Sequence, residues 1–336
     1  MAAVHQDGNA LRYASDTLKK DKKVVMAAVQ QDGNALEYVP EFQDDPDIVM
    51  AAVQQDGWSL QFSPTLQNDK VFMMAAVTQN GNVLNFAPEF KEDRDIVMAA
   101  VKQDGNALQY AGDFQADEDI VMAAVKNDGR ALQYANDFQN NRKVVMTALQ
   151  EDGMALEFAQ AFQDDIDVVM TAVNNDGNAL MFASVRLKDD REVVMTAVNN
   201  DGYALMFASV RLKADREVVM TAVTKDGYAL MFANVTLRAD PDIACAAIQN
   251  NPNALEFVDP SLDENDDFIE CMMKYNVNPG KRVDLKGHIM DRQSLKNTAK
   301  SQSDTMKYVV NHFLGGKRKG SRRRTRRRTS RRTRRR

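Results

Sequence analysis

Residue types that could carry chemistry are few and scattered. The three histidines are His5, His288 and His312, and the two cysteines are Cys245 and Cys271. No His/Cys cluster has the spacing of zinc ligands, and the sequence contains neither a GxGxxG nor a GxxxxGK[ST] phosphate loop. We therefore expect no catalytic residue, no metal and no cofactor. The protein is not expected to be an enzyme, an expectation that a convergent polar pocket would reverse.

One acidic pattern does recur, because an aspartate stands directly before a glycine again and again. A stacked column of such carboxylates could form an acidic or calcium-binding ridge, but the EF-hand spacing of aspartates and its closing glutamate are missing. The simpler interpretation is that each aspartate caps a helix that starts just after it. The aspartates are Asp7, Asp32, Asp56, Asp104, Asp128, Asp152, Asp176, Asp201 and Asp226.

The glycines of this pattern reveal an internal repeat of 24 or 25 residues. A methionine lies seven residues before each glycine, and an eleventh copy has Cys245 and Pro252 in these two places. Such a fixed period indicates a repeat architecture. The glycines are Gly8, Gly33, Gly57, Gly81, Gly105, Gly129, Gly153, Gly177, Gly202 and Gly227.

Each repeat reads as a capped pair of helices. An Asp or Asn lies twelve residues before each glycine from Gly33 onward and suits a helix N-cap, and Pro46 and Pro241 directly follow two of these caps. The pattern predicts a helix from Pro46 to about Gln55, closed by a left-handed glycine. A second short helix follows, as in Asn34 to Val39, and a Phe or Leu then closes the repeat.

Helix pairs of this size bury their apolar faces only when they are stacked. The fold class predicted is therefore all-α, an α-solenoid of about 11 tandem two-helix repeats over residues 1–262. The methionines of the repeat are expected in its core. A leucine-rich repeat is a weaker alternative, since its strand pattern is absent. Residues 263–316 are expected to form a helical C-terminal cap that begins with a helix from Asp266 to Tyr275. An N-terminal cap is either missing or replaced by a frayed first helix.

The repeats resemble the family called domain of unknown function 4116, whose copies read much like VVLAAVKQNGxALxYAS. The segments IVMAAVKQDGNALQYA (96–111) and IVMAAVKNDGRALQYA (120–135) carry the resemblance, which covers residues 1 to about 262. It implies a helical repeat array common in large DNA viruses and some protists, with no established activity. The GGKRK-plus-arginine ending also resembles tails of algal-type giant-virus proteins.

Function in a solenoid lies in its variable surface positions. The residues one and four positions after the glycine point away from the predicted apolar face, and we call them the outward pair. Three consecutive repeats place methionine at the second of these positions, and two of them add a tyrosine. These residues predict a partner-binding patch, although recent duplication or packing between repeats would produce the same pattern. The candidate partner-binding residues are Trp58, Arg130, Met181, Tyr203, Met206, Tyr228 and Met231.

The C-terminal segment 317–336 contains 14 basic and no acidic side chains, whereas residues 1–316 carry 29 basic and 48 acidic ones, a net charge of −19. So charged a tail is predicted to be disordered and to bind DNA or RNA phosphates without sequence preference, because it has no aromatic residue to stack on bases. Nuclear import or virion targeting, an anionic membrane surface and acidic proteins are alternatives. The candidate nucleic-acid-binding residues are Lys317, Arg318, Lys319, Arg322, Arg323, Arg324, Arg326, Arg327, Arg328, Arg331, Arg332, Arg334, Arg335 and Arg336.

The composition also indicates the cellular compartment of the protein. No apolar run reaches the roughly 18 residues of a membrane helix, and the first residues do not resemble a signal peptide. Two cysteines cannot build a disulfide framework and suit a reducing compartment. We expect an intracellular protein, in the cytoplasm or nucleus, or in the viral factory or virion if the source is viral. The partner protein, the curvature and the oligomeric state do not follow from the sequence.

Overall fold

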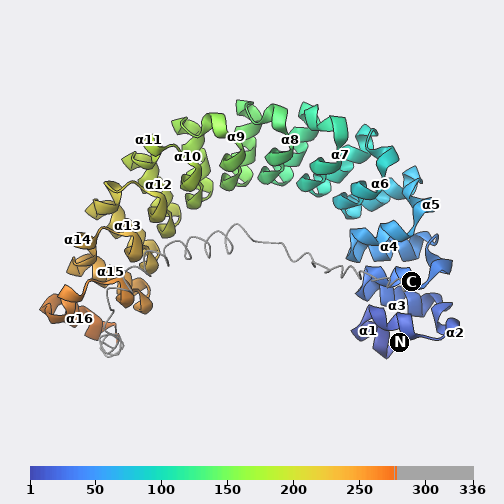
Figure 1. Ribbon diagram of the computed structural model, residues 1–336, viewed down its shortest axis with the longest axis horizontal. Coiled ribbons are helices and arrows are strands. Elements are labelled where there is room, and N and C mark those ends of the chain that lie inside the picture. The colour runs from blue at the N-terminus through green and yellow to red at the C-terminus, as the bar shows by residue number, and fades with distance from the viewer. Residues whose placement is uncertain (276, 278–336) are drawn as a thin grey trace, which may run out of the picture. The chain divides into compact units, whose positions relative to one another are not determined.

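The computed structural model describes residues 1–275 and 277, and these residues belong to one structural unit. Within the described residues the chain folds into helices and contains no β-strand. Figure 1 shows the repeats following one another side by side in chain order, from α1 (Ala2–Gln6) to α16 (Asp266–Lys274). Each repeat contacts the one before it and the one after it, as in α3 with α4 and α7 with α8. The all-α solenoid predicted from the sequence is confirmed.

The main element of every repeat after the first is a ten-residue α-helix that starts where the sequence predicted. In α4 the Asp45 carboxylate accepts hydrogen bonds from the N–H groups of Asp47 (3.1 Å) and Ile48 (3.3 Å). These bonds satisfy donors that the first helical turn leaves unpaired. The ten-residue helices are α3 (Lys22–Gln31), α4 (Pro46–Gln55), α6 (Lys70–Gln79), α7 (Arg94–Gln103), α8 (Glu118–Asn127), α9 (Arg142–Glu151), α10 (Ile166–Asn175), α12 (Arg191–Asn200), α13 (Arg216–Lys225) and α15 (Pro241–Asn250).

The second helix of each repeat is a six-residue 3₁₀-helix, not the α-helix expected. With three residues per turn, positions one and four after the glycine share one outward face, while the other two faces turn inward. These helices are η1 (Gly8–Tyr13), η2 (Gly33–Tyr38), η4 (Gly57–Phe62), η5 (Gly81–Phe86), η7 (Gly105–Tyr110), η9 (Gly129–Tyr134), η11 (Gly153–Phe158), η13 (Gly177–Phe182), η14 (Gly202–Phe207), η16 (Gly227–Phe232) and η17 (Pro252–Phe257).

A third, very short helix closes each repeat where the sequence analysis expected one apolar side chain, and the labels α2, α5, α11 and α14 mark it along one edge of the row (Figure 1). These segments are α2 (Asp16–Lys19), η3 (Pro40–Phe42), α5 (Pro64–Gln67), η6 (Pro88–Phe90), η8 (Gly112–Ala116), η10 (Asn136–Phe138), η12 (Gln160–Phe162), α11 (Val185–Lys188), η15 (Leu212–Ala214), α14 (Val235–Arg238) and η18 (Pro260–Glu264).

The repeated glycines are required by close packing, not by a left-handed backbone. Among the described residues only Gly112 has a positive φ, of 55°, and it lies outside the repeated position. A Cβ at Gly153 would lie under 3.0 Å from the carbonyl oxygen of Ala172 in the next repeat, and Gly202 meets Ala222 in the same way. The left-handed helix stop predicted from the sequence is therefore wrong. The glycine begins the 3₁₀-helix and lets it approach the next α-helix.

The core is a continuous apolar layer made by two faces of each helix pair. Ile48, Val49, Ala52 and Val53 of α4 are fully buried, as is Leu60 of the following 3₁₀-helix. The same positions are buried in the other repeats. At about 25 cal/mol per Å² of apolar surface, this stacked layer is the main stabilising contribution. Each repeat covers apolar side chains of the repeats beside it. A repeat with a neighbour on both sides is therefore expected to be more stable than a repeat at an end of the row.

Candidate protein-binding surface

The outward pairs lie on the exposed side of the 3₁₀-helices, where the tyrosines and methionines of the Gly202 and Gly227 repeats are half-buried. Tyr203 packs edge-to-face on Phe232 of the next repeat, with ring centres 4.8 Å apart. Tyr228 packs on Phe257 in the same way at 5.9 Å. Such pairs contribute about 0.5–1.5 kcal/mol beyond their area. The tyrosines therefore join neighbouring repeats, and their remaining surface stands beside Met206 and Met231.

In most other repeats the first member of the outward pair is an asparagine that joins two repeats by a hydrogen bond. Asn34 Nδ2 donates to the Asp56 carboxylate at 3.0 Å, and Asn178 donates to Asp201 at 2.6 Å. Equivalent bonds join Asn9 to Asp32, Asn82 to Asp104, and Asn106 to Asp128, each at 2.5 Å. Replacing asparagine with tyrosine exchanges this polar link for an aromatic one. The tyrosine repeats thus change their surface without giving up contact between repeats.

The remaining candidates in the first half of the chain do not gather in one place. Trp58 packs edge-to-face on Phe86 at 5.2 Å, and 59% of its surface is exposed. Arg130 lies 3.7 Å from the Glu157 carboxylate of the next repeat. Neither residue adjoins the tyrosine repeats in the chain order of the row. The structure therefore separates Trp58 and Arg130 from the patch formed by Met181, Tyr203, Met206, Tyr228 and Met231.

Exposed valines, which the sequence analysis missed, accompany this patch. Val185, Val210 and Val235 are 85%, 79% and 53% exposed. They begin, or lie just before, the third segments of the three consecutive 25-residue repeats that contain Gly177, Gly202 and Gly227. The sequence does contain a signal for these valines, because in each of the three repeats an apolar residue directly follows the Ser or Asn before the third segment. Three aliphatic side chains in successive repeats add to the apolar surface of the same part of the row.

These three consecutive repeats, called the 25-residue repeats from here on, differ from the 24-residue repeats in how the linker before the third segment is bonded. The first repeat, which contains Gly8, also spans 25 residues but is not included in this term. The N–H of the extra residue donates to a carbonyl of the preceding repeat, Ser184 to Gln163 at 2.8 Å and Ser209 to Lys188 at 2.9 Å. Ser209 Oγ also donates to the Asp189 carboxylate, to which Arg211 donates at 3.0 Å. The serine and then the arginine lower the pKa of Asp189.

Lysine replaces glutamine in the polar contact that follows. In the 24-residue repeats a glutamine amide donates to a 3₁₀-helix carbonyl, as Gln43 does to Leu36 at 3.1 Å. In the 25-residue repeats Lys188 Nζ donates to the Met181 carbonyl and Lys213 to the Met206 carbonyl, both at 2.7 Å. Burial lowers the pKa of both lysines. These bonds fix the backbone directly at the second member of the outward pair.

The repeated methionines are not core residues, contrary to the sequence-based expectation. Met26, Met50, Met98, Met122 and their counterparts are half-buried, on the outward face of the ten-residue helices. Val49 and Val53 of α4, by contrast, are fully buried. The apolar run of the helix is too wide for the layer beneath it, so its methionine remains at the surface. The row of methionines therefore lines a second face of the solenoid.

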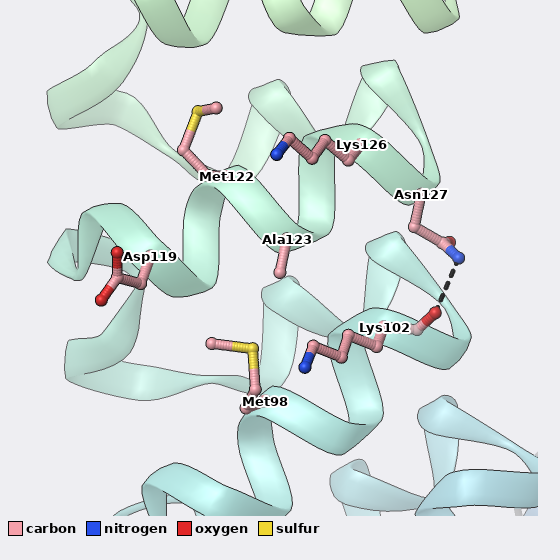
Figure 2. A pocket seen from close by; sticks show the side chains of 7 residues that line it. All are labelled: Met98, Lys102, Asp119, Met122, Ala123, Lys126 and Asn127. Atoms are coloured by element: carbon pink, nitrogen blue, oxygen red, sulfur yellow. Dashed lines mark hydrogen bonds between the residues drawn. The ribbon is translucent and has the colours of Figure 1, made fainter.

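Shallow grooves lined in part by the repeated methionines run between neighbouring ten-residue helices. Figure 2 shows Met98 of α7 pointing towards α8 and Met122 of α8 pointing away from α7, with Lys102 and Lys126 on the same surface. Asn127 Nδ2 closes one end by donating to the Lys102 carbonyl at 2.9 Å. This open groove measures about 510 Å³, and a similar one of about 430 Å³ lies between α6 and α7. Both carry charges of both signs and no convergent set of catalytic groups.

Ion pairs link the beginnings of successive ten-residue helices. The first residue of α7, Arg94, contacts Asp117 at 3.1 Å and Asp119 at 3.0 Å, both in the next repeat. Lys70 contacts Asp93 at 2.6 Å, and Arg142 contacts Asp165. The hydrogen bond from Lys70 is the largest cause that lowers the pKa of Asp93. These exposed pairs orient neighbouring repeats and have structural, not catalytic, geometry.

The aspartates before the glycines act as caps, which confirms the simpler interpretation of that column. Asp32 accepts from the N–H of Asn34 at 2.9 Å, and Asp201 accepts from Tyr203 at 2.9 Å. No group of three or more metal-ligating side chains is found among residues 1–275 and 277. Burial is the main cause that raises the pKa of Asp152. Each of these aspartates caps a 3₁₀-helix, and several also accept a hydrogen bond from an asparagine of the preceding repeat. These two roles account for the repeated Asp-Gly pattern.

The two cysteines are paired in the structure. Cys245 of α15 and Cys271 of α16 form a disulfide with Cα atoms 5.9 Å apart. The sequence-based prediction assigned both to a reducing compartment because two cysteines are too few for a disulfide framework. Stacking brings the methionine position of the last repeat against the following helix. The bond therefore joins the last full repeat to α16.

Several sequence-based predictions lie outside the described residues. They include the helical C-terminal cap 263–316 beyond its first helix, His288, His312 and the whole basic tail 317–336. The helix predicted from Asp266 to Tyr275 is confirmed, with Tyr275 as its C-cap. In the part of the chain that the structure describes, no helix is long and apolar enough to cross a membrane.

Stacked helical repeats with a continuous core and a variable outer face define a protein of the α-solenoid class. The family model described as Domain of unknown function (DUF4116) matches residues 1–43, 45–89, 72–115, 117–160, 165–213 and 215–263. These matches cover most of the chain, which therefore belongs to this family. Neither the curated proteins nor the solved structures gave a match.

Proposed function

We propose that the protein is a non-enzymatic repeat scaffold that binds a partner protein through its 25-residue repeats. The observation that carries this proposal is the apolar character of three consecutive repeats, where Met181, Met206 and Met231 replace the polar residues found elsewhere. Two tyrosines and three exposed valines extend the same part of the row. Contiguous exposed apolar surface of this kind marks protein-binding sites, and tyrosine and methionine are enriched there.

The backbone beneath this surface is held in place before any partner arrives. Lys188 and Lys213 bond the carbonyls of Met181 and Met206, and the edge-to-face contact of Tyr203 fixes its ring. Side chains held in this way lose little conformational freedom on binding, which favours affinity. The surface is thus suited to recognise one partner, in contrast to an adaptable methionine-rich surface without such restraints.

The test exchanges the patch for residues that the 24-residue repeats carry. A variant with Tyr203→Asn, Met206→Gln, Tyr228→Asn and Met231→Gln should fold, because the asparagine at 203 faces Asp226 as other asparagines face their caps. Quantitative affinity capture from cells of the source organism should lose a discrete protein with this variant. The matched control, Asn106→Ser with Gln109→Lys, should retain it. The proposal is wrong if both variants capture the same set of proteins as the parent chain.

The basic tail supports a second role, the binding of nucleic acid without sequence preference. Its 14 positive charges contrast with residues 1–275, which carry 22 basic and 45 acidic side chains, a net charge of −23. The negative charge of residues 1–275 repels phosphate groups. Nucleic acid would therefore be held by the tail. Nuclear or virion targeting, with a structural or host-interaction role for the array, is the alternative, consistent with the proposed viral origin.

Salt-dependent binding separates these roles of the tail. The full chain should bind labelled duplex DNA and single-stranded RNA with an affinity that falls steeply as salt rises. A chain truncated to residues 1–316 should not bind. If neither chain binds at low salt, nucleic-acid binding is excluded and the targeting alternative remains.

A further inference from the structure

A separate pocket lies at the only tryptophan of the sequence, away from the 25-residue repeats. It spans three successive 3₁₀-helices, η4, η5 and η7, and measures about 260 Å³. Small-molecule and cofactor sites are usually about 300–1,000 Å³, so this pocket is suited to a single side chain. Its lining residues are Gln55, Asp56, Gly57, Trp58, Asn80, Asn82, Asn85, Phe86 and Tyr110.

Aromatic rings form one side of this pocket. The Trp58 indole stands edge-to-face against Phe86, with an interplanar angle of 75°, yet 59% of the tryptophan surface remains exposed. Tyr110, from the following repeat, adds a third, half-buried ring. The exposed part of the indole is open to a ligand. The faces of aromatic rings attract cations, and tryptophan does so best of the aromatic side chains.

Amide and carboxylate oxygens form the other side. The Asn82 amide nitrogen already donates to Asp104 at 2.5 Å, which orients the amide oxygen of Asn82 away from that carboxylate. Asn80 Oδ1 accepts a hydrogen bond from the N–H of Asn82 at 3.1 Å. Asp56 supplies a carboxylate, which already accepts from the N–H of Trp58 and from Asn34 Nδ2, both at 3.0 Å, and Asn85 supplies a further amide oxygen. The lining therefore offers one carboxylate and several amide oxygens as acceptors, together with the N–H groups of the same amides.

The charge of the pocket lining favours a cation as the ligand. Its lining contains one formal charge, the Asp56 carboxylate, and no lysine or arginine. The grooves beside α7 differ, since both include Lys102. Residues 1–275 carry a net charge of −23, which attracts basic segments over a longer range. A guanidinium suits this pocket better than an ammonium, because its flat face stacks on an indole while its five N–H donors reach several acceptors.

We propose that the pocket at Trp58 binds one arginine side chain from an extended, basic segment of a partner protein. The aliphatic stem and guanidinium lie on the indole face, and the N–H donors bond Asp56 and the amide oxygens of Asn82 and Asn85. This proposal deepens the protein-binding role proposed above by naming a second site and its ligand. It does not involve the residues of the 25-residue repeats.

The tryptophan itself reports on the pocket, because its fluorescence is the only tryptophan signal of the full chain. Titration with acetyl-hexa-arginine amide should change the emission of Trp58 and reach saturation. Acetyl-hexa-lysine amide has the same charge and should bind about fivefold more weakly, the difference expected for about 1 kcal/mol of stacking and hydrogen bonding. Equal affinity for the two peptides would show attraction to the acidic array alone and would overturn the proposal.

A pair of variants separates the pocket from its surroundings. Asn85→Leu removes an acceptor but keeps the fluorescent reporter, and should weaken hexa-arginine binding about fivefold. Gln133→Leu alters the same position of the 3₁₀-helix two repeats later, outside the pocket, and should leave binding unchanged. The proposal fails if the two variants behave alike or if no saturable change occurs with the parent chain. Because Tyr203 and Met206 are intact throughout, this result is independent of the partner-capture experiment.

Discussion

The 24-residue and 25-residue repeats share one stacked core but join their neighbours differently at the surface. Asparagine-to-aspartate hydrogen bonds are common in the shorter repeats, as between Asn106 and Asp128 at 2.5 Å. The longer repeats add a backbone hydrogen bond through their extra residue, as between Ser184 and Gln163 at 2.8 Å. This extra support accompanies the exposed apolar side chains. In the three consecutive 25-residue repeats the added residue coincides with an apolar outer surface, whereas the first repeat, also 25 residues long, keeps the polar outward pair Asn9 and Arg12.

The largest effect should come from the glycine that both kinds of repeat share. Gly81→Ala and Gly202→Ala would each place a Cβ under 3.0 Å from a carbonyl oxygen of the next repeat. Each should cost about 3 kcal/mol of unfolding free energy in urea titrations, because the backbones must separate. Gly112→Ala meets no atom within 4 Å but has φ of 55°, and should cost only about 1 kcal/mol. Unequal losses at Gly81 and Gly202 would show that repeat length alters the core contact.

The covalent junction at the end of the row should have the next largest effect. Cys245 and Cys271 close a loop with a sequence separation of 26 residues, for which the entropic stabilisation is about 3 kcal/mol. Reduction should increase hydrogen exchange in α16 while the amides of α7 and α8 stay protected. Mass spectrometry of the exchanged peptides measures both regions in one sample. Faster exchange along the whole row would mean that the disulfide stabilises more than this junction.

The substitution Ser184→Pro removes the added hydrogen bond of the longer repeats, together with the bonds of the Ser184 hydroxyl to Asp164 and to the N–H of Leu187. Ser184→Pro deletes the donor to Gln163, and its native φ of −60° already suits proline. The variant should lose about 1 kcal/mol, measured by urea unfolding. Val185→Pro is the matched control, since Pro40, Pro64 and Pro88 begin the third segments of shorter repeats. Equal stability of the two variants would show that the extra hydrogen bond does not stabilise the longer repeats.

The smallest effect concerns the lysines that replace glutamine. Burial lowers the pKa of Lys188 and Lys213, so their protonated forms destabilise the folded state below the folded pKa. That penalty disappears as pH rises through the folded pKa towards the ordinary value of 10.5. Lys188→Gln with Lys213→Gln should raise the melting temperature slightly at pH 7, and the difference should shrink near pH 10. A difference independent of pH would exclude burial of charge as its cause.

The elements within one repeat were predictable from the sequence because caps and apolar spacing are local. The start of α4 at Pro46 and the cap role of Asp32 follow from residue types alone. The reason for Gly153 did not follow, because the atom that excludes a Cβ belongs to Ala172 of the next repeat. The sequence-based prediction placed Met98 in the core because its helix is apolar on more than one side. How much of that helix is covered depends on packing between repeats and cannot be read from the residues of one repeat.

The candidate site was predictable in part for the same reason. Tyr203 and Met206 share a face at a spacing of three residues in either kind of helix, so the outward pair was recognised correctly. The link from Tyr203 to Phe232 and the disulfide between Cys245 and Cys271 depend on contacts between repeats. The pocket at Trp58 spans three repeats and has no signature in any single one.

The most direct test of the proposed partner surface places a photoreactive benzoylphenylalanine at one of two equivalent positions in the full chain. Position 206 belongs to a 25-residue repeat, and position 133 is its counterpart in a 24-residue repeat. Irradiation in cells of the source organism should join a discrete protein to the chain labelled at 206 and none to the chain labelled at 133. The same adducts from both positions, or adducts from 133 alone, would contradict the assignment of partner binding to the longer repeats.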